Sequence, residues 1–331
     1  MKRTMKSLVL YYSQSGNTEK VAKAIQSGII SATGQCDIAF LDLKQTKVSS
    51  LLDYDLIGIG APAFGFLEPG NVATFLKRLK RLTPLAGKDS FIFTTHAGHP
   101  GNIFPSMEGK LKRAGLRLLG GFGCDGQYFL PHRITPWFTD GHPDQTDLKQ
   151  AADFGREMAD KKEQLDKGKA VPLAHFPWLR GGIYRDIAIL GKESAKIRFT
   201  FDREQCAYPK CRLCVDKCPM DCINLDTDPV VVYQGRGCID CSFCEQVCPT
   251  GAVTYPEGYL PGMSQFFSGI VHKYNYPEWF QKAETQNLEH RGTLYRRIGE
   301  PVDIDDPNKA AFKALPKRPR VPKKLIAPAS K

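Results

Sequence analysis

The sequence lacks any long apolar run. None of its stretches reaches the roughly 18 apolar residues that a membrane-spanning helix requires, and the apolar segment nearest the N-terminus, SLVLYY, is short. It is too short for the apolar region of a secretory signal, and no small-residue cleavage site follows it. We therefore expect a cytoplasmic protein without a membrane span.

The composition also lacks the features of a disordered chain. Hydrophobic residues make up 42% and charged residues 24% of the 331 positions, as in ordinary soluble globular proteins. A chain of this length exceeds the roughly 100 to 200 residues of a typical domain. We therefore expect two domains and some additional chain.

The formal net charge of +11 is spread unevenly along the chain. Basic residues outnumber acidic ones by 21 to 16 over residues 1–165 and by 13 to 7 over residues 259–331, whereas the residues between carry 12 of each. Basic surfaces attract acidic proteins, anionic lipid or nucleic acid, and charge alone does not choose among these partners. The C-terminal PKRPRVPKKLIAPASK has no acidic residue and is predicted to be a disordered tail.

Short apolar runs alternate with amphipathic stretches through residues 1–165. The runs are apolar at nearly every position, as a parallel sheet covered on both faces requires. Five strands are predicted, in SLVLYY, CDIAFLDL, DLIGIGAP, SFIFTTHAG and LRLLGGFG, with helices after all but the second. The predicted fold class is a doubly wound α/β sheet, in which ligands bind beyond the carboxyl ends of the strands.

This pattern ends after residue 165. Residues 166–200 are predicted to be a linker with one short helix, and residues 201–258 to be a small cysteine-rich domain. Residues 259–331 form a C-terminal extension, whose aromatic clusters suggest packing onto the rest of the protein.

Nine of the eleven cysteines fall between Cys206 and Cys248. In a reducing cytosol, clustered thiols indicate metal binding or redox work rather than structural disulfides. The second half of the cluster reads Cys238-x2-Cys241-x2-Cys244-x3-Cys248-Pro249. This is the spacing of bacterial ferredoxins with two 4Fe-4S clusters, in which three thiolates hold one cluster and the fourth reaches the other.

The first half of the cluster reads Cys206-x4-Cys211-x2-Cys214-x3-Cys218-Pro219, which nearly repeats the second. Residues 201–258 therefore resemble the 2x 4Fe-4S ferredoxin family, which implies a small α+β domain. Both halves are followed by short apolar stretches, CINL and AVTY, as in ferredoxin half-repeats. Zinc usually takes four ligands with a longer spacer between the pairs, so the two groups of four cysteines favour iron-sulfur clusters. The resemblance implies eight iron ligands: Cys206, Cys211, Cys214, Cys218, Cys238, Cys241, Cys244 and Cys248.

One position departs from this family pattern. The family would place the first cysteine at position 208, where this chain has Tyr208. Cys206 can supply the ligand if AYPK makes a longer loop, and Cys222 is a rival beyond the terminating proline. If neither binds iron, the cluster would have three irons, or water or a carboxylate at one corner.

A hydroxyl-rich turn, Ser13-Gln14-Ser15-Gly16-Asn17-Thr18, lies between the first strand and its helix. Hydroxyls, a glycine and exposed helix amides suit a phosphate, although the same residues also cap helices in proteins that bind nothing. The turn lacks the lysine of a P-loop, which argues against a triphosphate with magnesium. Its position, first at the carboxyl edge of a five-stranded sheet, is where flavodoxin-like folds hold FMN.

The stretch YSQSGNT resembles the flavodoxin phosphate loop, and the resemblance extends over residues 7 to about 165. It implies that the loop after the third strand lies against the flavin ring, with Phe64 as the aromatic partner, and that the loop after the fourth contacts the pyrimidine edge. His96 and His99 are candidates to tune the ring, and Tyr128 is a second ring neighbour. The implied FMN residues are Ser13, Gln14, Ser15, Gly16, Asn17, Thr18, Pro62, Ala63, Phe64, Gly65, Thr95, His96, Ala97 and Gly98.

Two further features of the first domain have simpler interpretations. Gly58-Ile59-Gly60-Ala61-Pro62-Ala63 imitates a dinucleotide-binding GxGxxA, but Pro62 interrupts the turn and no acidic ribose-binding residue follows about 20 residues on. Cys36 and Cys124 lie beside apolar strands and are predicted to be packing residues.

The whole chain resembles flavodoxin-ferredoxin fusions of anaerobic bacteria and archaea, the EFR type. This resemblance implies electron transfer through FMN and two 4Fe-4S clusters, which would couple two-electron to one-electron carriers, with acidic redox proteins as partners and no nucleic acid. One alternative is a flavin-dependent reductase of a small molecule, with His96, His99 and His132 as proton donors. Another is a subunit of a larger redox complex. The oligomeric state stays open.

Overall fold

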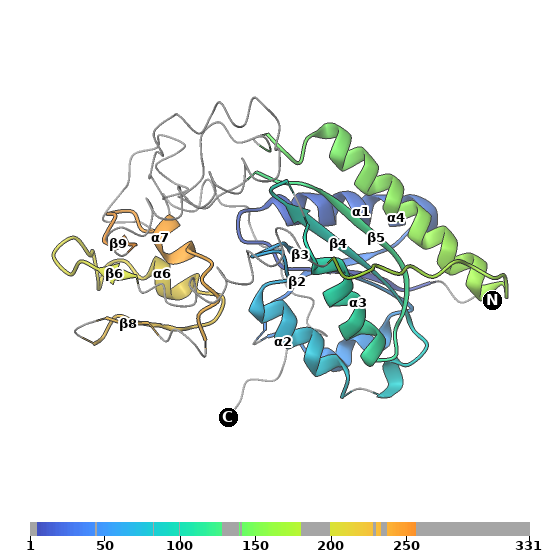
Figure 1. Ribbon diagram of the computed structural model, residues 1–331, viewed down its shortest axis with the longest axis horizontal. Helices are drawn as coiled ribbons and strands as arrows, with labels where there is room; N and C mark the ends of the chain where they lie inside the picture. The colour runs from blue at the N-terminus through green and yellow to red at the C-terminus, as the bar shows by residue number, and fades with distance from the viewer. Residues whose placement is uncertain are drawn as a thin grey trace. The chain divides into compact units, whose positions relative to one another are not determined.

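The structure of the protein is a computed structural model, which describes residues 5–43, 45–81, 83–98, 100–127, 139, 141–179, 199–227, 230–232 and 237–255. The chain forms two compact units. The first unit holds the described residues up to Gln127 and from Gly141 to Leu179, and the second holds those from Phe199 to Tyr255. Figure 1 shows the elements of each unit. The predicted C-terminal extension lies outside the described residues.

The first unit contains a five-stranded parallel sheet with strand order β2-β1-β3-β4-β5. Every residue of β1 is buried, because helices cover both faces of the sheet. The strand therefore lacks the alternation of apolar and polar residues that a half-exposed sheet shows. The predicted doubly wound fold is confirmed. The strands are β1 Ser7–Tyr11, β2 Asp37–Phe40, β3 Leu56–Pro62, β4 Asp89–His96 and β5 Arg117–Asp125.

Two helices lie on each face of this sheet (Figure 1). The pair α1 Asn17–Thr33 and α4 Gln145–Asp166 covers one face, and the pair α2 Gly70–Leu79 and α3 Ile103–Arg113 covers the other. Short 3-10 turns, η1 Val48–Asp53 and η2 Thr83–Leu85, complete the connections. All four helices expected from the sequence are present.

Helices α1 and α4 pack closely because each contributes a glycine to their contact. A Cβ atom on Gly28 would lie 1.9 Å from the carbonyl oxygen of Ala152, and one on Gly155 would lie 2.2 Å from that of Ile25. Neither separation is possible for real atoms. The two glycines therefore set how closely the backbones approach.

The glycines of the dinucleotide-like motif have a packing role inside β3. Gly58 pairs with Phe91 and Gly60 with Phe93 on the neighbouring strand. A Cβ atom on either glycine would lie 2.1 Å from the ring of the phenylalanine opposite. Both glycines thus make room for rings within the sheet, and they do not form the strand-to-helix turn that a dinucleotide fingerprint requires.

The second unit is built from very short elements. Antiparallel pairs join β6 to β9 and β7 to β8, and one helical turn precedes each of β7 and β9. Strands β7 and β9 fall in the apolar stretches CINL and AVTY, as the half-repeat pattern predicts. The elements are β6 Thr200–Phe201, α6 Leu213–Asp216, β7 Ile223–Asn224, β8 Val231–Val232, α7 Phe243–Gln246 and β9 Val253–Thr254.

The predicted linker begins inside the first unit. Helix α4 runs to Asp166, and the chain then packs along this unit without regular secondary structure as far as Leu179. The rest of the predicted linker, residues 180–198, lies outside the described part, so the short helix predicted for the linker stays a prediction. Among the helices that the structure describes, none combines the length and apolar character needed to cross a membrane.

Candidate functional site

The predicted phosphate loop connects β1 to α1. Gly16 precedes the helix with a φ of 93°, which is unfavourable for residues with a side chain, and its N–H donates to Ser13 Oγ over 3.1 Å. The first-turn amides of α1 have no partner within the helix and point out of its N-terminus. Ser13, Asn17 and Thr18 are buried here. A buried set of hydroxyls and amides at a helix N-terminus fits a phosphate group.

The loops after β3 and β4 meet the phosphate loop at the carboxyl edge of the sheet. Thr18 Oγ1 lies 2.8 Å from Thr95 Oγ1, and the N–H of Ala63 donates to the carbonyl of Thr95 over 2.9 Å. Asn17 Nδ2 donates to the carbonyl of Gln127, just past β5, over 3.1 Å. The structure therefore brings together the three segments that the resemblance assigns to FMN.

Phe64 lies in a tight turn at this edge. Phe64 and Leu67 exchange backbone hydrogen bonds of 2.8 and 3.1 Å, and the two residues between them, Gly65 and Phe66, both have positive φ. Positive φ at both central residues is the feature of a type I′ turn. Because the turn fixes the backbone on both sides of Phe64, its half-buried ring is held at the edge where the resemblance places the flavin.

His96 is paired with an acid that sequence reasoning did not single out. His96 Nδ1 lies 3.1 Å from Asp125 Oδ1, the same oxygen that accepts the N–H of Gly98 over 3.0 Å. Burial raises the pKa of Asp125, but the hydrogen bonds from His96 and Gly98 outweigh it and leave the pKa below its usual range. The carboxylate thus anchors the loop after β4. The position of Asp125 at the carboxyl end of β5 was the signal by which the sequence could have identified it. Three other residues named from the sequence, His99, Tyr128 and His132, lie outside the described residues.

The cysteines of the second unit line two hollows of nearly equal size. The hollows have empty volumes of about 350 Å³ and 340 Å³. Each is lined by four of the eight predicted ligands, three from one half of the sequence pattern and one from the other half. The first is lined by Cys238, Cys241, Cys244 and Cys218, and the second by Cys206, Cys211, Cys214 and Cys248.

Helical turns produce this exchange of the fourth cysteine. Cys214 lies on α6 and Cys244 on α7, and each is followed after its turn by the cysteine that lines the opposite hollow. The two turns contact each other. The three-residue gap in each half therefore has the geometric effect that the ferredoxin pattern requires.

The longer first gap forms a closed loop. The N–H of Cys211 donates to the carbonyl of Ala207 over 3.0 Å, and the N–H of Cys206 donates to that of Asp202 over 3.0 Å. The hydroxyl of Tyr208, which stands where the family has a cysteine, bonds to Asp226. The two extra residues thus loop out, and Cys206 still faces the hollow with Cys211.

Cys222 lines the other hollow. Its side chain is 4% exposed, its Sγ lies 3.4 Å from Cys218 Sγ, and its thiol also bonds to Cys238. It is therefore a fifth thiol at the hollow that already has Cys241 and Cys244. The structure does not bring it to the hollow that contains Cys206.

Burial makes three of these thiols, Cys214, Cys241 and Cys244, poor acids. It raises the pKa of Cys214 and of Cys241 to about 12 and that of Cys244 well above its ordinary value. The other lining residues are mostly apolar, among them Leu213, Ile239 and Phe243. A coordinating thiol is deprotonated outright, so binding of iron would release protons here. An apolar hollow with four converging thiols fits an iron-sulfur cluster.

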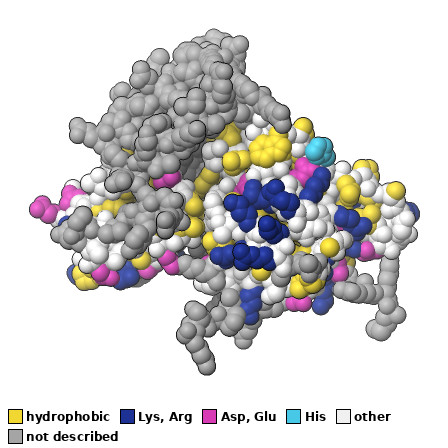
Figure 2. Space-filling view, turned by 60° about the horizontal axis from the view of Figure 1, so that its bottom comes forward, with side chains coloured by type: hydrophobic (Ala, Val, Ile, Leu, Met, Phe, Trp, Pro, Cys, Tyr) yellow, Lys and Arg dark blue, Asp and Glu magenta, His cyan; other side chains and the backbone are white. Residues whose placement is uncertain are grey.

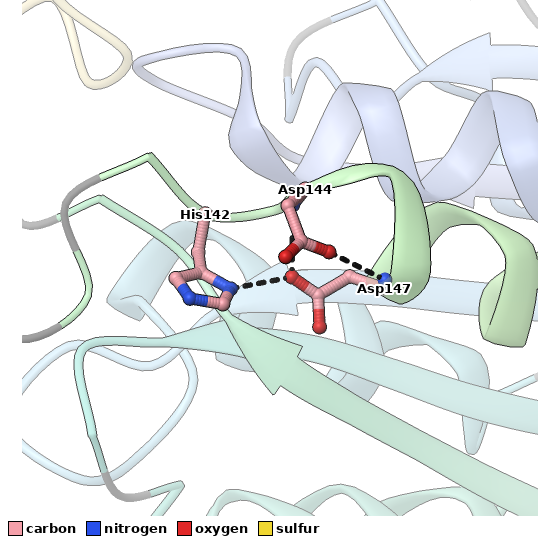
Figure 3. Close-up of side chains that lie close together, drawn as sticks. All are labelled: His142, Asp144 and Asp147. Carbon is pink, nitrogen blue, oxygen red and sulfur yellow. Dashed lines mark hydrogen bonds and ion pairs between the residues drawn. The ribbon is translucent and has the colours of Figure 1, made fainter.

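One further cluster of potential metal ligands has a structural explanation. His142, Asp144 and Asp147 lie together at the start of α4 (Figure 3). Asp144 accepts the N–H groups of Thr146 and Asp147, and Asp147 accepts the N–H of Asp144 over 2.9 Å and bonds to His142 Nδ1 over 2.6 Å. These oxygens form a capping box for the helix, and we assign the cluster that role.

The two cysteines outside the second unit lie against the core of the first. Cys124 is buried and Cys36 is partly buried. They have the packing positions predicted for them.

Comparisons with known proteins match both parts of the chain. Residues 9–137 match the flavodoxin family, and residues 190–254 match a 4Fe-4S dicluster domain. The chain is 41% identical over 58 residues to a ferredoxin of Methanothermococcus thermolithotrophicus, a match that spans 18% of this chain and 97% of that ferredoxin. It is 26% identical over 153 residues to a flavodoxin of Clostridium beijerinckii, spanning 46% of this chain and 97% of that flavodoxin.

Among solved structures, a flavodoxin from the domain Archaea aligns with 48% of this chain and 99% of its own length, at 21% identity and a TM-score of 0.38. A flavodoxin domain implies FMN, a dicluster domain implies two 4Fe-4S clusters, and together they support electron transfer through these cofactors. The chain is thus a fusion, in which residues 9–137 form a flavodoxin domain and residues 190–254 form a dicluster domain of the ferredoxin family.

Proposed function

We propose that this protein passes electrons between protein partners and changes two-electron into one-electron transfer within one chain. When bound, FMN exchanges one or two electrons and each cluster exchanges one. The observation that carries the proposal is the sorting of eight cysteines into two hollows, each with three from one half and one from the other. The domain boundaries, 1–165 and 201–258, and the cytoplasmic location belong to this proposal.

The protein's own residues have distinct tasks in this proposal. Ser13 to Thr18 bind the phosphate of FMN, Phe64 covers the ring, and residues 95–98 lie against its pyrimidine edge. Two sets of four thiolates hold the clusters, and the apolar side chains around them exclude water. Backbone N–H groups that bond to sulfur, as Asp240 does to Cys238 over 3.4 Å, adjust the cluster potentials.

We assign Cys206 as the ligand that completes the cluster of the first half. It lines the hollow with Cys211, Cys214 and Cys248, whereas Cys222 lies at the other one. Analysis of iron, sulfide and flavin under anaerobic conditions should give about eight irons and one FMN per chain. Cys206→Ala should lower the iron content or give a three-iron EPR signal, and Cys222→Ala should retain all the iron. The reverse outcome would show that Cys222 is the ligand.

A group of exposed basic side chains supports an acidic partner. The last turn of α2 and the residues that follow it carry Lys77, Arg78, Lys80 and Arg81, which we call the basic patch. The side that carries α2 and α3 comes forward in Figure 2, where Lys and Arg side chains gather near the middle of the view. Within the described residues, no acidic side chain pairs with Lys77, Lys80 or Arg81. The basic patch lies at the opposite end of α2 from the flavin loops, so it acts through its field on approach.

Salt dependence tests this role. With a plant-type 2Fe-2S ferredoxin as the probe, Lys80→Glu with Arg81→Glu should lower the second-order rate of electron transfer and flatten its dependence on ionic strength. Lys149→Glu is the control on the other face of the sheet, because Lys149 is exposed on α4, and the effects are compared per reversed charge, since the double change reverses two. If both changes had equal effects on the rate, the net charge of the protein and not the basic patch would account for the salt dependence, and the basic patch would have no part in the proposal.

A further inference from the structure

Asp125 holds the loop after β4 from the neighbouring strand. It is the last residue of β5 and pairs in register with His96, the last residue of β4. One of its oxygens, Oδ1, accepts the N–H of Gly98 over 3.0 Å and lies 3.1 Å from His96 Nδ1. A single carboxylate oxygen therefore connects two positions of a loop that the flavodoxin resemblance assigns to the flavin.

Backbone hydrogen bonds hold the same loop on either side of His96. The carbonyl of His96 accepts the N–H of Gly126 over 2.8 Å, and the carbonyl of Thr95 accepts that of Ala63 over 2.9 Å. Gly98 has a φ of 101°, a conformation that residues with a side chain rarely adopt. All these contacts come from the protein itself, so part of the shape of the loop is set before a ligand binds.

The carboxylate of Asp125 also brings a charge to this loop. Burial opposes the ionised form, but the hydrogen bonds from His96 and Gly98 outweigh it and hold the pKa of Asp125 below its usual range. An ionised carboxylate can only accept hydrogen bonds, so His96 Nδ1 carries a proton. Asp125 thus determines which nitrogen of His96 is protonated, and it places one negative charge beside the loop.

We propose that Asp125 is a positioning residue of the FMN site, which acts through Gly98 and His96. Its oxygen sets the loop in the shape that receives the pyrimidine edge of the flavin, and its charge disfavours reduced FMN, which gains negative charge at that edge. Charge near this part of the ring is one way in which a protein tunes a flavin. The inference rests on the proposed binding of FMN here. It adds the end of β5 to the loops after β1, β3 and β4 that the resemblance implies.

Two variants separate the shape of the loop from the charge. Asp125→Asn removes the charge and keeps an oxygen that can accept from Gly98 and His96, whereas Asp125→Ala also removes the acceptor. Asp53→Asn is the matched control, because Asp53 is exposed and precedes β3, at the opposite edge of the sheet. The measurements use the full-length protein with its clusters, from which FMN is removed and to which it is added back.

Hydrogen exchange at the Gly98 amide reports the shape of the loop without flavin. Asp125→Ala should exchange faster than the wild type here and should raise the dissociation constant of oxidised FMN at least about fivefold, because the loop must then be ordered on binding. Asp125→Asn should match the wild type in both measurements. NMR of the His96 ring in the wild type should show the proton on Nδ1.

The two-electron midpoint potential of the flavin reports the effect of the charge. Asp125→Asn should raise this potential, which corresponds to an affinity for reduced FMN that increases at least about threefold relative to oxidised FMN, since one negative charge is removed. Asp53→Asn should leave the potential unchanged.

Three outcomes overturn the inference and leave the proposed function intact. They are equal Gly98 exchange in the wild type and Asp125→Ala, equal affinity of these two proteins for oxidised FMN, and an unchanged potential in Asp125→Asn. Should Asp125→Ala fail to fold, the potential of Asp125→Asn decides alone. A wild-type protein that binds no FMN overturns the proposed function and this inference with it.

Discussion

In the flavodoxin domain, the predicted cofactor residues occupy loops at the edge of a large core, which includes Tyr11, Phe75 and Phe91. In the ferredoxin domain, by contrast, the predicted ligands are themselves core residues: Cys248 is part of the small cluster around Phe199 and Val253, and Cys206 and Cys244 pack against it. The first domain can bury enough apolar surface to fold without its cofactor. The second has strands of two residues and helices of one turn, so its cofactors must supply much of its stability.

The sharpest way to break this comparison is to remove the iron. Anaerobic treatment with an iron chelator should unfold the residues from Phe199 to Tyr255, because four buried or half-buried thiols around each vacated hollow would remain without a metal. Helices α1 and α4 should stay folded, since no predicted iron ligand takes part in the packing between them. Amide hydrogen exchange measured per residue distinguishes the two domains. Persistent protection of the amides of Cys248 and Val247 without iron would contradict the contrast.

Removal of FMN supplies the control for this experiment. The flavodoxin domain should lose protection locally, near Gly16 and Gly98, and keep its global unfolding transition. Collapse of the whole sheet without flavin would mean that both domains depend on their cofactors alike.

The second prediction concerns the crossing of cysteines between the two halves. Cys248→Ala and Cys206→Ala should each remove the same cluster or leave it with three irons, and the double change should retain the four irons of the other cluster, because both residues line the same hollow. Cys248→Ala with Cys241→Ala should remove both clusters, since Cys241 lines the other hollow. Iron and sulfide analysis of these four proteins measures this. Cys124→Ala, a buried cysteine of the flavodoxin domain, should keep all the iron.

The third prediction tests the cofactor-independent core through its helix contact. Gly155→Ala should destabilise the flavodoxin domain by about 1 to 3 kcal/mol, because the new methyl group would collide with the carbonyl of Ile25. Gly109→Ala, in helix α3 with open space around it, should stabilise the domain by about 0.5 to 1 kcal/mol. Urea unfolding followed by flavodoxin-domain signals gives both values. Equal effects of the two changes would mean that the glycines do not set the helix contact.

The smallest expected effect is a pH dependence at the start of α4. The hydrogen bond to Asp147 raises the pKa of His142 in the folded protein. A histidine whose pKa is higher in the folded than in the unfolded chain stabilises the folded state when it is protonated. This stabilisation is fully present below the unfolded pKa of about 6.5 and is lost as the pH rises through the folded pKa. NMR titration of the His142 ring should therefore give a pKa above that of an unfolded peptide. The urea midpoint should fall slightly over the same pH range, and His142→Gln should remove this change.

The sequence predicted the parts of the molecule that depend on local pattern. Apolar runs such as LIGIGAP indicated buried strands of a parallel sheet, and their order with the helices indicated the doubly wound fold. The cysteine spacing predicted two sets of four ligands, because two-residue and three-residue gaps have fixed geometric consequences along a short loop. The loop after Gly16 was recognisable for the same reason.

Contacts between residues far apart in the chain could not be predicted in this way. Asp125 binds His96 and Gly98 only because β4 and β5 are neighbours in the sheet. Residues 169–179 gave no periodic signal, since Phe176 is held there by Glu108 and Phe104 from α3. Cys222 looked like a rival for the first cluster, and the turn after Cys218 directs it to the other hollow.

By itself, then, the sequence determined the fold class, the two domains and the cofactor chemistry, because strand burial and ligand spacing are written in neighbouring residues. The tertiary structure decided which cysteine lies at which hollow, what holds the loop after β4, and what holds residues 169–179. Each of these depends on side chains brought together across the sheet or between the two cysteine arms, and local pattern does not encode such contacts.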